Sequence, residues 1–259
     1  MSSGTTESRT YSIVIPAYNE SERITATLDK VLAHIAQQHW TAEIVVVNDG
    51  SRDNTAEIVR RYGRQNPAVR LVENPGNRGK GFSVRNGMMN ANGDVLLFTD
   101  ADLSSPIYEA KKLFDALDAG ADVAIGSRWL RAELQTQRQS LLRQIFSRVY
   151  NLLLRIILGL RFVDTQCGFK AFKREAAQQI FPRMRIERWG FDPEALYLAR
   201  KAKLRVDEIA VEWANDDRSK VNPVRDGIRM FTELLRVRWN DLTGKYTAPA
   251  TPAAVTTGT

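Results

Sequence analysis

Short apolar runs alternate with segments of helical character along the first half of the chain. Five runs rich in Val, Ile and Leu have the length of buried strands and end at turn-forming or polar residues: 12–16, 43–47, 69–72, 94–99 and 122–126. The segments between them carry helical spacing or helix start signals: 22–36, 53–62, 80–91 and 106–119. Strands that alternate with helices predict an α/β fold with a mainly parallel sheet and flanking helices.

The pattern changes in the second half. Residues 140–160 form a long helical segment rich in Leu and Ile, a strand is predicted over 205–213, and a last amphipathic helix over 223–242. Shorter elements are predicted at 169–172, 176–181 and 191–202. Residues 11–242 therefore form one domain. We expect the ends, 1–10 and 247–259, to be disordered, because such sequences bury too little apolar area to offset their ordering entropy.

Polar motifs follow the predicted strands. In open parallel sheets, ligands bind beyond the carboxyl ends of the strands, so these motifs mark the functional edge. They are Pro16-Ala17-Tyr18-Asn19-Glu20, Asn48-Asp49-Gly50-Ser51, Asp100-Ala101-Asp102 and Gly126-Ser127-Arg128.

Asp100 and Asp102 are the central candidates for metal binding. Two carboxylates two residues apart, directly after a strand, can share Mg²⁺ or Mn²⁺, which prefer oxygen ligands and often complete their shell with phosphate oxygens. Such an ion would neutralise charge on a diphosphate leaving group. The alternative is a solvated loop. The position between an apolar strand and Pro106, beside three other polar strand ends, favours the metal site.

Two further motifs allow more than one interpretation. Asp49 ends a run of valines and can accept a hydrogen bond from a base or a ribose, but Asn-Asp-Gly is also a good turn sequence by itself. The segment 76–81 places glycines, Arg78 and Lys80 before a helix, which suits a phosphate or a nucleotide. It does not have the spacing of a P-loop, and a flexible loop is the alternative.

The formal net charge of +7 suits either a solvated surface or an anionic partner. No aromatic-basic platform, zinc spacing or recognition helix suggests a nucleic acid. Cys167 is the only cysteine, which excludes an intrachain disulfide and fits a reducing compartment. No N-terminal segment resembles a signal peptide, and the most apolar stretch, 152–163, is interrupted by Arg155 and Arg161. We therefore expect a cytoplasmic protein whose membrane contact is peripheral, on the cytoplasmic face.

The ordered set of motifs resembles the family 2 glycosyltransferases with a GT-A fold, over about residues 11–240. The later segments 164–170, 188–192 and 219–220 look most like the dolichyl-phosphate or polyprenyl-phosphate β-glucosyltransferase branch, a relative of the dolichyl-phosphate mannosyltransferases. The resemblance implies that Asp100 and Asp102 bind the metal and the diphosphate. It implies nucleotide-binding roles for Pro16, Ala17, Tyr18, Glu20, Asp49, Lys80, Arg218 and Lys220. Ser104 stands where mannosyl relatives carry a further Gln ligand.

The same resemblance implies a cradle for an acceptor phosphate. Arg128 follows a strand end, and Arg143 and Ser147 lie four residues apart, on one face of a predicted helix. Surface arginines on an amphipathic helix are the alternative. A phosphate monoester is already anionic at neutral pH and needs only positioning, so direct displacement with inversion is expected. Asp192 is a further catalytic candidate, and the remaining sugar-pocket candidates are Gln166, Lys170 and Trp189.

Two amphipathic helices, 141–160 and 223–242, are candidates for the bilayer interface, because apolar residues and arginines alternate on them. Packing on the core or on a second subunit is the alternative, and the second of these would make the protein an oligomer.

Together these features predict transfer of glucose from UDP-glucose to a polyprenyl phosphate. The alternatives are a mannosyl or N-acetylhexosaminyl donor, a soluble glycan acceptor, or a non-catalytic nucleotide- or membrane-binding protein.

Overall fold

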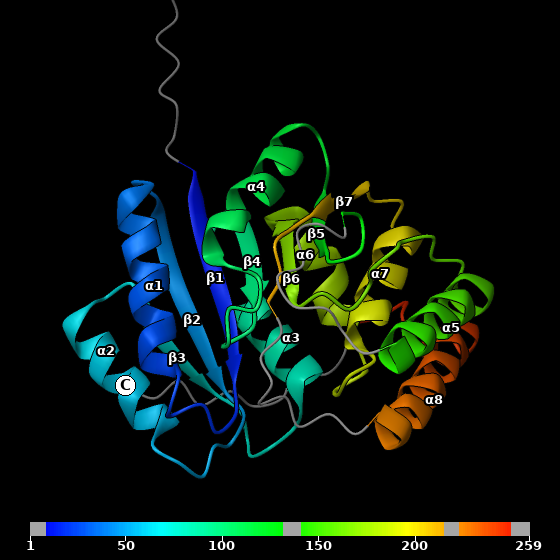
Figure 1. The fold of residues 1–259 in the computed structure, drawn as a ribbon, viewed down its shortest axis with the longest axis horizontal. Helices are drawn as coiled ribbons and strands as arrows, with labels where there is room; N and C mark the ends of the chain where they lie inside the picture. The colour runs from blue at the N-terminus through cyan, green and yellow to red at the C-terminus, as the bar shows by residue number, and fades with distance from the viewer. Residues whose placement is uncertain (1–8, 132–140, 215–222, 250–259) are drawn as a thin grey trace, which may run out of the picture.

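The computed structural model describes residues 9–131, 141–214 and 223–249. In the helix that begins at Leu141 side chains are described from Tyr150 onward, and in the helix that begins at Pro223 they are described from Arg229 onward. A seven-stranded sheet runs through the middle, with helices on both faces (Figure 1). The strand order is β3-β2-β1-β4-β6-β5-β7. The strands are β1 (Thr10–Ala17), β2 (Thr41–Asn48), β3 (Val69–Glu73), β4 (Val95–Thr99), β5 (Val123–Ser127), β6 (Phe169–Lys173) and β7 (Val206–Ala210).

One strand runs against the others. β6 pairs antiparallel with both β4 and β5, and the remaining neighbours pair parallel. Because Thr99 lies opposite Phe169, the start of β6 lies at the edge where β4 ends. Residues just before β6 therefore reach the same edge of the sheet as the motif after β4.

The helices divide between the two faces of the sheet. One face is covered by α1 (Ile24–Gln37), α2 (Thr55–Gln65) and α4 (Ala110–Asp118), whose buried side chains join a core with Ile13, Ile15 and Leu97. The other face packs on Val14, Phe98 and Ile125. It is covered by α3 (Lys80–Asn90), α5 (Leu141–Leu158), α6 (Arg174–Ile180), α7 (Phe191–Lys201) and α8 (Pro223–Leu242).

The central strands are apolar on both sides because both faces are covered. In β1, Ile13 and Ile15 point into one core and Val14 into the other, and all three are fully buried. Each such side chain contributes about 1.5–3 kcal/mol when it leaves water. This explains why the strands of the first half are continuous apolar runs in the sequence.

The predicted elements are present, with changes at their ends. The predicted helix over 106–119 divides into a 3₁₀ turn, Ile107–Glu109, followed by α4. The predicted strand over 205–213 is shorter, because only Val206–Ala210 pairs with β5. The first strand, β1, begins at Thr10, two residues before the predicted strand.

α5 and α8 pack against each other at one side of the molecule (Figure 1). Within the described part of the chain, no helix is both long enough and apolar enough to span a bilayer.

Candidate active site

Four strand ends and one strand start converge at a single edge of the sheet. β1 ends at Ala17, β2 at Asn48, β4 at Thr99 and β5 at Ser127, while β6 begins at Phe169. This places the four sequence motifs and the segment before β6 around one location. The predicted convergence of these motifs follows from the strand order.

Asp100 is paired with a lysine at this edge. Its Oδ1 lies 2.6 Å from Nζ of Lys80, the first residue of α3, and both side chains are partly exposed. Burial lowers the pKa of Lys80, but the carboxylates of Asp100 and Asp192 outweigh it, so that pKa is raised. A cation is thus already in contact with the first carboxylate of the motif.

Gly168 leaves room for the Asp100 carboxylate. A Cβ placed at Gly168 would lie 2.2 Å from Oδ2 of Asp100, so a larger residue would displace that side chain. Gly168 directly precedes β6, and the antiparallel register brings it opposite the residue after Thr99. The glycine is required by this close approach.

Asp102 is held in a tight turn. Leu103 adopts a left-handed backbone, with φ 49°, and its amide donates to the carbonyl of Asp100 over 3.1 Å. The Ser104 amide donates to Oδ1 of Asp102 over 2.9 Å. The pKa of Asp102 is raised, first by loss of hydration and then by the negative charge of Asp100. Ser104 thus orients a carboxylate.

These two carboxylates suit a divalent cation whose other ligands come from a substrate. They are hard oxygen donors, and their mutual repulsion is relieved by a positive charge between them. Within the described residues, no group of three or more His, Cys, Asp or Glu side chains is arranged to hold a metal. Water and phosphate oxygens are the usual further ligands of such an ion.

Glu20 lies near the same carboxylates. Its side chain is paired with Arg23 over 2.6 Å, and its amide donates to the Thr55 hydroxyl over 2.8 Å. Burial raises the pKa of Glu20, the charge of Arg23 opposes the rise, and the charges of Asp102 and Asp100 add to it. Of the neighbouring candidates, Pro16 is partly exposed, Ala17 is buried and Tyr18 is exposed at the end of β1.

Asp49 organises the segment that leads into α3. Its Oδ1 accepts hydrogen bonds from the Asn74 side chain (2.8 Å) and the Arg78 amide (2.9 Å), and its Oδ2 accepts one from the Gly79 amide (2.8 Å). The side chain is buried. The carboxylate therefore fixes the loop before Lys80, in addition to any contact with a nucleoside.

The glycines before and within the start of α3 allow close packing. A Cβ at Gly81 would lie 2.6 Å from Cβ of Phe191 and 2.7 Å from the carbonyl oxygen of Ile186. Phe82 donates its amide to the Glu187 carbonyl over 2.9 Å. The segment 186–191 is thus packed closely against the start of α3. The loop before α3 is also held in place, because Asp49 accepts hydrogen bonds from the amides of Arg78 and Gly79.

Lys170 and Asp192 form a buried ion pair. Nζ of Lys170 lies 2.5 Å from Oδ1 of Asp192 and 2.6 Å from the Cys167 carbonyl oxygen, and the lysine is fully buried over the Phe98 ring. Burial raises the pKa of Asp192, although Lys170 and Lys80 oppose the rise. The ammonium of Lys170, a predicted sugar-pocket residue, points to Asp192.

Arg128 is held by a carboxylate that the sequence did not single out as a site residue. Its Nε and Nη2 bind the two oxygens of Asp164 at 2.6 and 2.8 Å, and its amide donates to the same carboxylate over 3.0 Å. Burial lowers the pKa of Arg128, but Asp164 outweighs it and keeps the guanidinium charged. The backbone amide of Gln166 donates to Asp164 over 3.1 Å, so this carboxylate also fixes the backbone at a predicted sugar-pocket residue.

Trp189 connects two parts of the site. It is exposed, and Nζ of Lys80 lies 5.7 Å from its ring centre. The next residue, Gly190, donates its amide to Oε2 of Glu233 on α8 over 2.7 Å. The loop that carries Trp189, and that leads into the first turn of α7 with Asp192, is thereby attached to the last helix.

Several candidates have no described side chain. Arg143 and Ser147 lie in α5, ahead of the side chains that are described, and Arg218 and Lys220 lie outside the described residues. Their predicted roles remain predictions.

The structure adds Tyr150, Ser127, Gly168 and Asp164 to the candidate set. The hydroxyls of Tyr150 and Ser127 are buried and have no hydrogen-bond partner within the described residues. Burial raises the pKa of Tyr150, and the charges of Asp192 and Glu233 raise it further. The one sequence signal for Tyr150 is its spacing from Ser147 and Arg143, three and seven residues earlier on the same helix.

Comparison with known proteins agrees with this geometry. The model of glycosyl transferase family 2 matches residues 12–181. A dolichyl-phosphate beta-glucosyltransferase of Trichomonas vaginalis is 37% identical over 234 residues, covering 86% of this chain and 69% of that protein. The Drosophila melanogaster protein of that name is 37% identical over 248 residues, covering 91% and 76%. The Saccharomyces cerevisiae protein of that name is 35% identical over 254 residues, again covering 91% and 76%.

The fold also matches solved structures. Glucosyl-3-phosphoglycerate synthase of Mycobacterium tuberculosis, crystallised with Mn²⁺, UDP and glucosyl-3-phosphoglycerate, superposes with a TM-score of 0.64 at 18% identity. The superposition covers 94% of this chain and 82% of that one, and it concerns the fold alone. The predicted fold and family are confirmed. The chain therefore belongs to glycosyl transferase family 2, has the GT-A fold, and is a glycosyltransferase of the branch that contains the dolichyl-phosphate beta-glucosyltransferases.

Proposed function

We propose that the chain transfers glucose from UDP-glucose to a polyprenyl phosphate of the dolichyl type, with inversion, to give a β-linked product. The observation that carries the proposal is the pair Asp100 and Asp102 at the end of β4, placed beside Lys80 and the nucleotide motifs of β1 and β2. The identity of 33–37% to proteins named dolichyl-phosphate beta-glucosyltransferases supports the choice of sugar and acceptor.

The donor would be held by its diphosphate and its base. Asp100 and Asp102 would hold Mg²⁺ or Mn²⁺, which supplies a positive charge for the departing diphosphate. Lys80 is close enough to Asp100 to add a second cation at the same place. The motifs after β1 and β2, which include Pro16, Ala17, Tyr18, Glu20 and Asp49, would bind the nucleoside.

The acceptor would need positioning more than activation. A phosphate monoester carries about −1.5 to −2 charge at neutral pH, so no general base has to remove a proton before it attacks. Arg128, fixed by Asp164, would orient that phosphate together with Arg143 and Ser147 of α5. The attack by a phosphate oxygen on the anomeric carbon, opposite the departing UDP, inverts the configuration at that carbon. Alignment and charge stabilisation then supply the catalysis.

The enzyme would act at a membrane surface as a peripheral protein, on the cytoplasmic face. Among the residues whose side chains are described, six exposed large apolar ones lie on α5 and α8: Leu152, Ile156, Phe231, Leu235, Trp239 and Leu242. Two adjacent helices with exposed apolar residues and many arginines suit the interface of a bilayer with anionic lipid. Such a location brings the lipid phosphate to the site.

A donor panel tests the proposal. UDP-glucose, GDP-mannose and UDP-N-acetylglucosamine would each be offered with a short polyprenyl phosphate and Mg²⁺ or Mn²⁺, and the product anomer read by NMR. The expected result is a β-glucosyl phosphate from UDP-glucose alone. A mannosyl or N-acetylhexosaminyl product would show that the proposed donor is wrong. Transfer to a soluble glycan alone would show that the proposed acceptor is wrong.

A further inference from the structure

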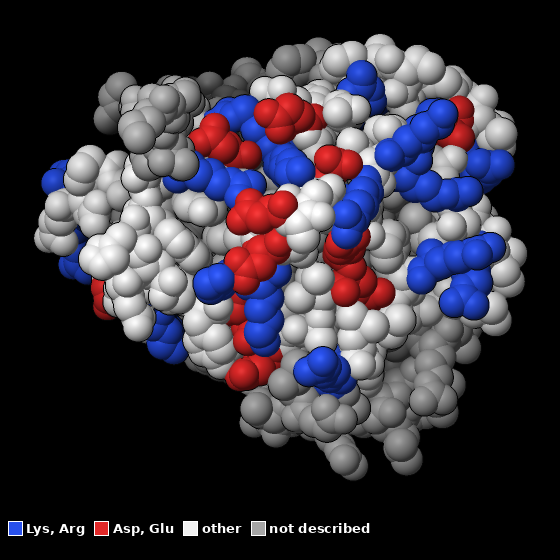
Figure 2. All heavy atoms as spheres, turned by 90° about the horizontal axis from the view of Figure 1, so that it is seen from above, with Lys and Arg blue, Asp and Glu red and all other residues white. Residues whose placement is uncertain are grey.

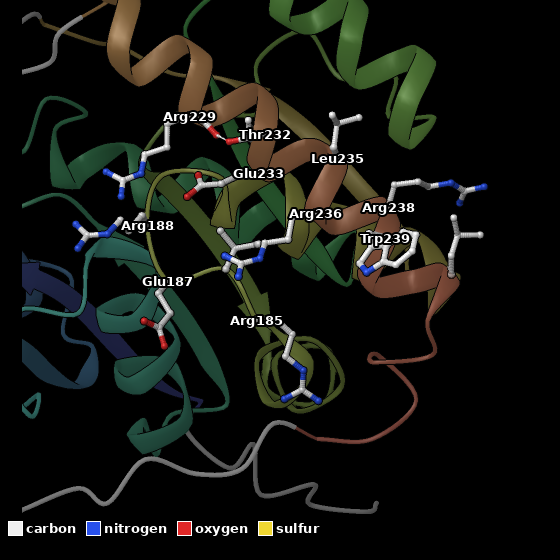
Figure 3. A pocket seen from close by; sticks show the side chains of 12 residues that line it. Arg185, Glu187, Arg188, Arg229, Thr232, Glu233, Leu235, Arg236, Arg238 and Trp239 are labelled. Carbon is white, nitrogen blue, oxygen red and sulfur yellow. Dashed lines mark hydrogen bonds between the residues drawn. The ribbon is translucent and has the colours of Figure 1, made fainter.

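A basic groove lies between α8 and the segment 185–188. Its volume is about 950 Å³, and it is open to solvent along α8 (Figure 3). We call it the arginine groove. It is lined by five arginines, Arg185, Arg188, Arg229, Arg236 and Arg238, by two glutamates, and by Leu235, Trp239 and Leu242 among others.

The two glutamates of the arginine groove already have partners. Glu187 is paired with Arg78, and Glu233 accepts the Gly190 amide at 2.7 Å. In Figure 3, Glu233 lies between Arg229 and Arg236. Burial raises the pKa of Glu233, while Arg229, Arg236 and Arg188 oppose the rise, so all three guanidiniums act on one carboxylate. The groove therefore carries an excess of positive charge.

Two other arginines of the groove are engaged elsewhere. Arg185 donates to the carbonyls of Lys245 and Ala248, and Arg238 is paired with Asp241. Within the described part of the chain, no side-chain hydrogen bond or ion pair involves Arg188, Arg229 or Arg236. A guanidinium binds phosphate through two parallel hydrogen bonds, so these three can receive an anionic phosphate ester.

One wall of the arginine groove is apolar and exposed. Leu235, Trp239 and Leu242 are 47%, 63% and 68% exposed, and their spacing of four and three residues places them on one stripe of α8. Indole rings are typical of membrane interfaces, where one end is apolar and the other hydrated. Arg229 and Arg236, seven residues apart, lie beside this stripe.

Charges elsewhere on the molecule include pairs of opposite sign. On the face in Figure 2, acidic and basic side chains lie interspersed across the middle. Outside the groove, for example, Arg205 is paired with Asp207 and Lys111 with Asp115. Residues 250–259 contain no Asp or Glu, so that segment lacks the side-chain charge that would complement the arginines.

We propose that the arginine groove binds the phosphate headgroup of an anionic membrane phospholipid, whose acyl chains lie along Leu235, Trp239 and Leu242. This ligand is distinct from the lipid that accepts the sugar. The proposal rests on the proposed function only in that it assumes an enzyme working at a bilayer. Occupation of the groove would also bear on the active site, because Glu233 holds Gly190, the neighbour of Trp189.

Vesicle binding without any polyprenyl phosphate tests the proposal. Wild-type protein and Arg229→Gln/Arg236→Gln would be sedimented with vesicles of phosphatidylcholine alone and of phosphatidylcholine with phosphatidylglycerol. The wild type is expected to prefer the anionic vesicles, and the double variant to lose about 30-fold in affinity for them. The matched control is Lys30→Gln/Arg61→Gln, which removes the same charge from exposed positions on α1 and α2 and is expected to keep the preference.

The outcomes separate this proposal from the proposed function. If the groove variant lost no more than the control, or if the wild type bound both vesicles equally, the arginine groove would not be a headgroup site. Glucosyl transfer to a short acceptor in solution is measured alongside, and the groove variant is expected to retain it. Failure of the wild type in that assay would overturn the proposed function and leave the vesicle result intact.

Discussion

At the residue scale, Asp100 and Asp102 occupy different environments. Asp100 is neutralised by Lys80 at 2.6 Å, whereas Asp102 accepts a backbone amide and has a raised pKa from lost hydration and from Asp100. We expect Asp100→Asn and Asp102→Asn each to lower the transfer rate about a hundredfold or more, because either change removes charge from the diphosphate site. UDP release at saturating Mn²⁺ measures this. Asp118→Asn, at the exposed end of α4, serves as the control, and full activity of either site variant would contradict the assignment.

The Lys170–Asp192 pair gives a second prediction at this scale. Both side chains are buried and 2.5 Å apart, so Lys170→Met leaves a carboxylate in the interior without its cation. We expect the free energy of unfolding to fall by about 3–5 kcal/mol. The double variant Lys170→Met/Asp192→Leu should recover part of this loss, because no buried charge remains. Denaturant titrations of the four proteins of the cycle measure the coupling. Additive losses would show that the two groups act independently.

At the element scale, the antiparallel strand β6 controls the shape of the site. Its register places Gly168 against Asp100, and a Cβ there would lie 2.2 Å from the carboxylate. We expect Gly168→Ala to weaken Mn²⁺ binding and slow transfer at least tenfold, since Asp100 must move. Calorimetric titration of Mn²⁺ with UDP measures the binding, and thermal unfolding checks that the fold persists. Unchanged Mn²⁺ affinity in a folded variant would refute the steric role of Gly168.

The elements were predictable from the chain because their signals are local. Alternating apolar runs and helical segments located β1 to β5 and the helices between them, and the motifs after β1, β2, β4 and β5 meet as the parallel order requires. The direction of β6 was not predictable, because a segment of five residues carries no information about the strands it pairs with. That direction depends on pairing with β4 and β5, which are distant in sequence.

The side chains that contact the site residues could not be predicted from local sequence patterns either. Arg128 was a candidate from its position after a strand, but its carboxylate, Asp164, lies 36 residues away. Lys170 was assigned to a sugar pocket by resemblance, and its contact with Asp192 spans 22 residues. Such pairs arise when the second half of the chain folds back onto the sheet. A sequence pattern identifies the charged residue, and the fold determines what it contacts.

At the scale of the whole molecule, Glu194 links three parts of the chain. It is buried on α7 and accepts hydrogen bonds from the amides of Arg185 and Ile186, both at 2.9 Å, and from the Tyr246 hydroxyl at 2.7 Å. Burial raises the pKa of Glu194 to about 7, against the partly compensating hydrogen bonds. The folded state therefore binds a proton at pH values where the unfolded chain has released it.

The free energy of unfolding therefore depends on pH through Glu194. Between about pH 4.5 and 7 the folded protein holds more protons on Glu194 than the unfolded chain, so stability decreases as the pH rises, by about 3 kcal/mol in total. We expect Glu194→Gln to remove this decrease, whatever its effect at a single pH. Urea denaturation from pH 4.5 to 8 measures the slope. Exposed Glu175→Gln is the control and should keep the wild-type slope.

The pair α5 and α8 determines how the molecule would meet a bilayer. Ile156 on α5 and Trp239 on α8 are 70% and 63% exposed, although the same helices bury Leu154 and Leu234 in the core. Side chains of this size remain in water at a free-energy cost of about 1.5–3 kcal/mol each, which transfer into lipid would recover. The proposed membrane contact therefore predicts a loss of binding when these residues become polar, independent of the arginines.

We expect Ile156→Gln/Trp239→Gln to weaken binding to phosphatidylcholine vesicles about a hundredfold, because two large apolar side chains no longer enter the lipid. Transfer to a long-chain polyprenyl phosphate in those vesicles should fall in parallel, while transfer to a short acceptor in solution should stay near the wild-type rate. Met89→Gln, an exposed apolar residue on α3, is the matched control and should change neither. Equal loss with both acceptors would mean that the residues support the active site itself, and unchanged vesicle binding would exclude this pair of helices as the membrane contact.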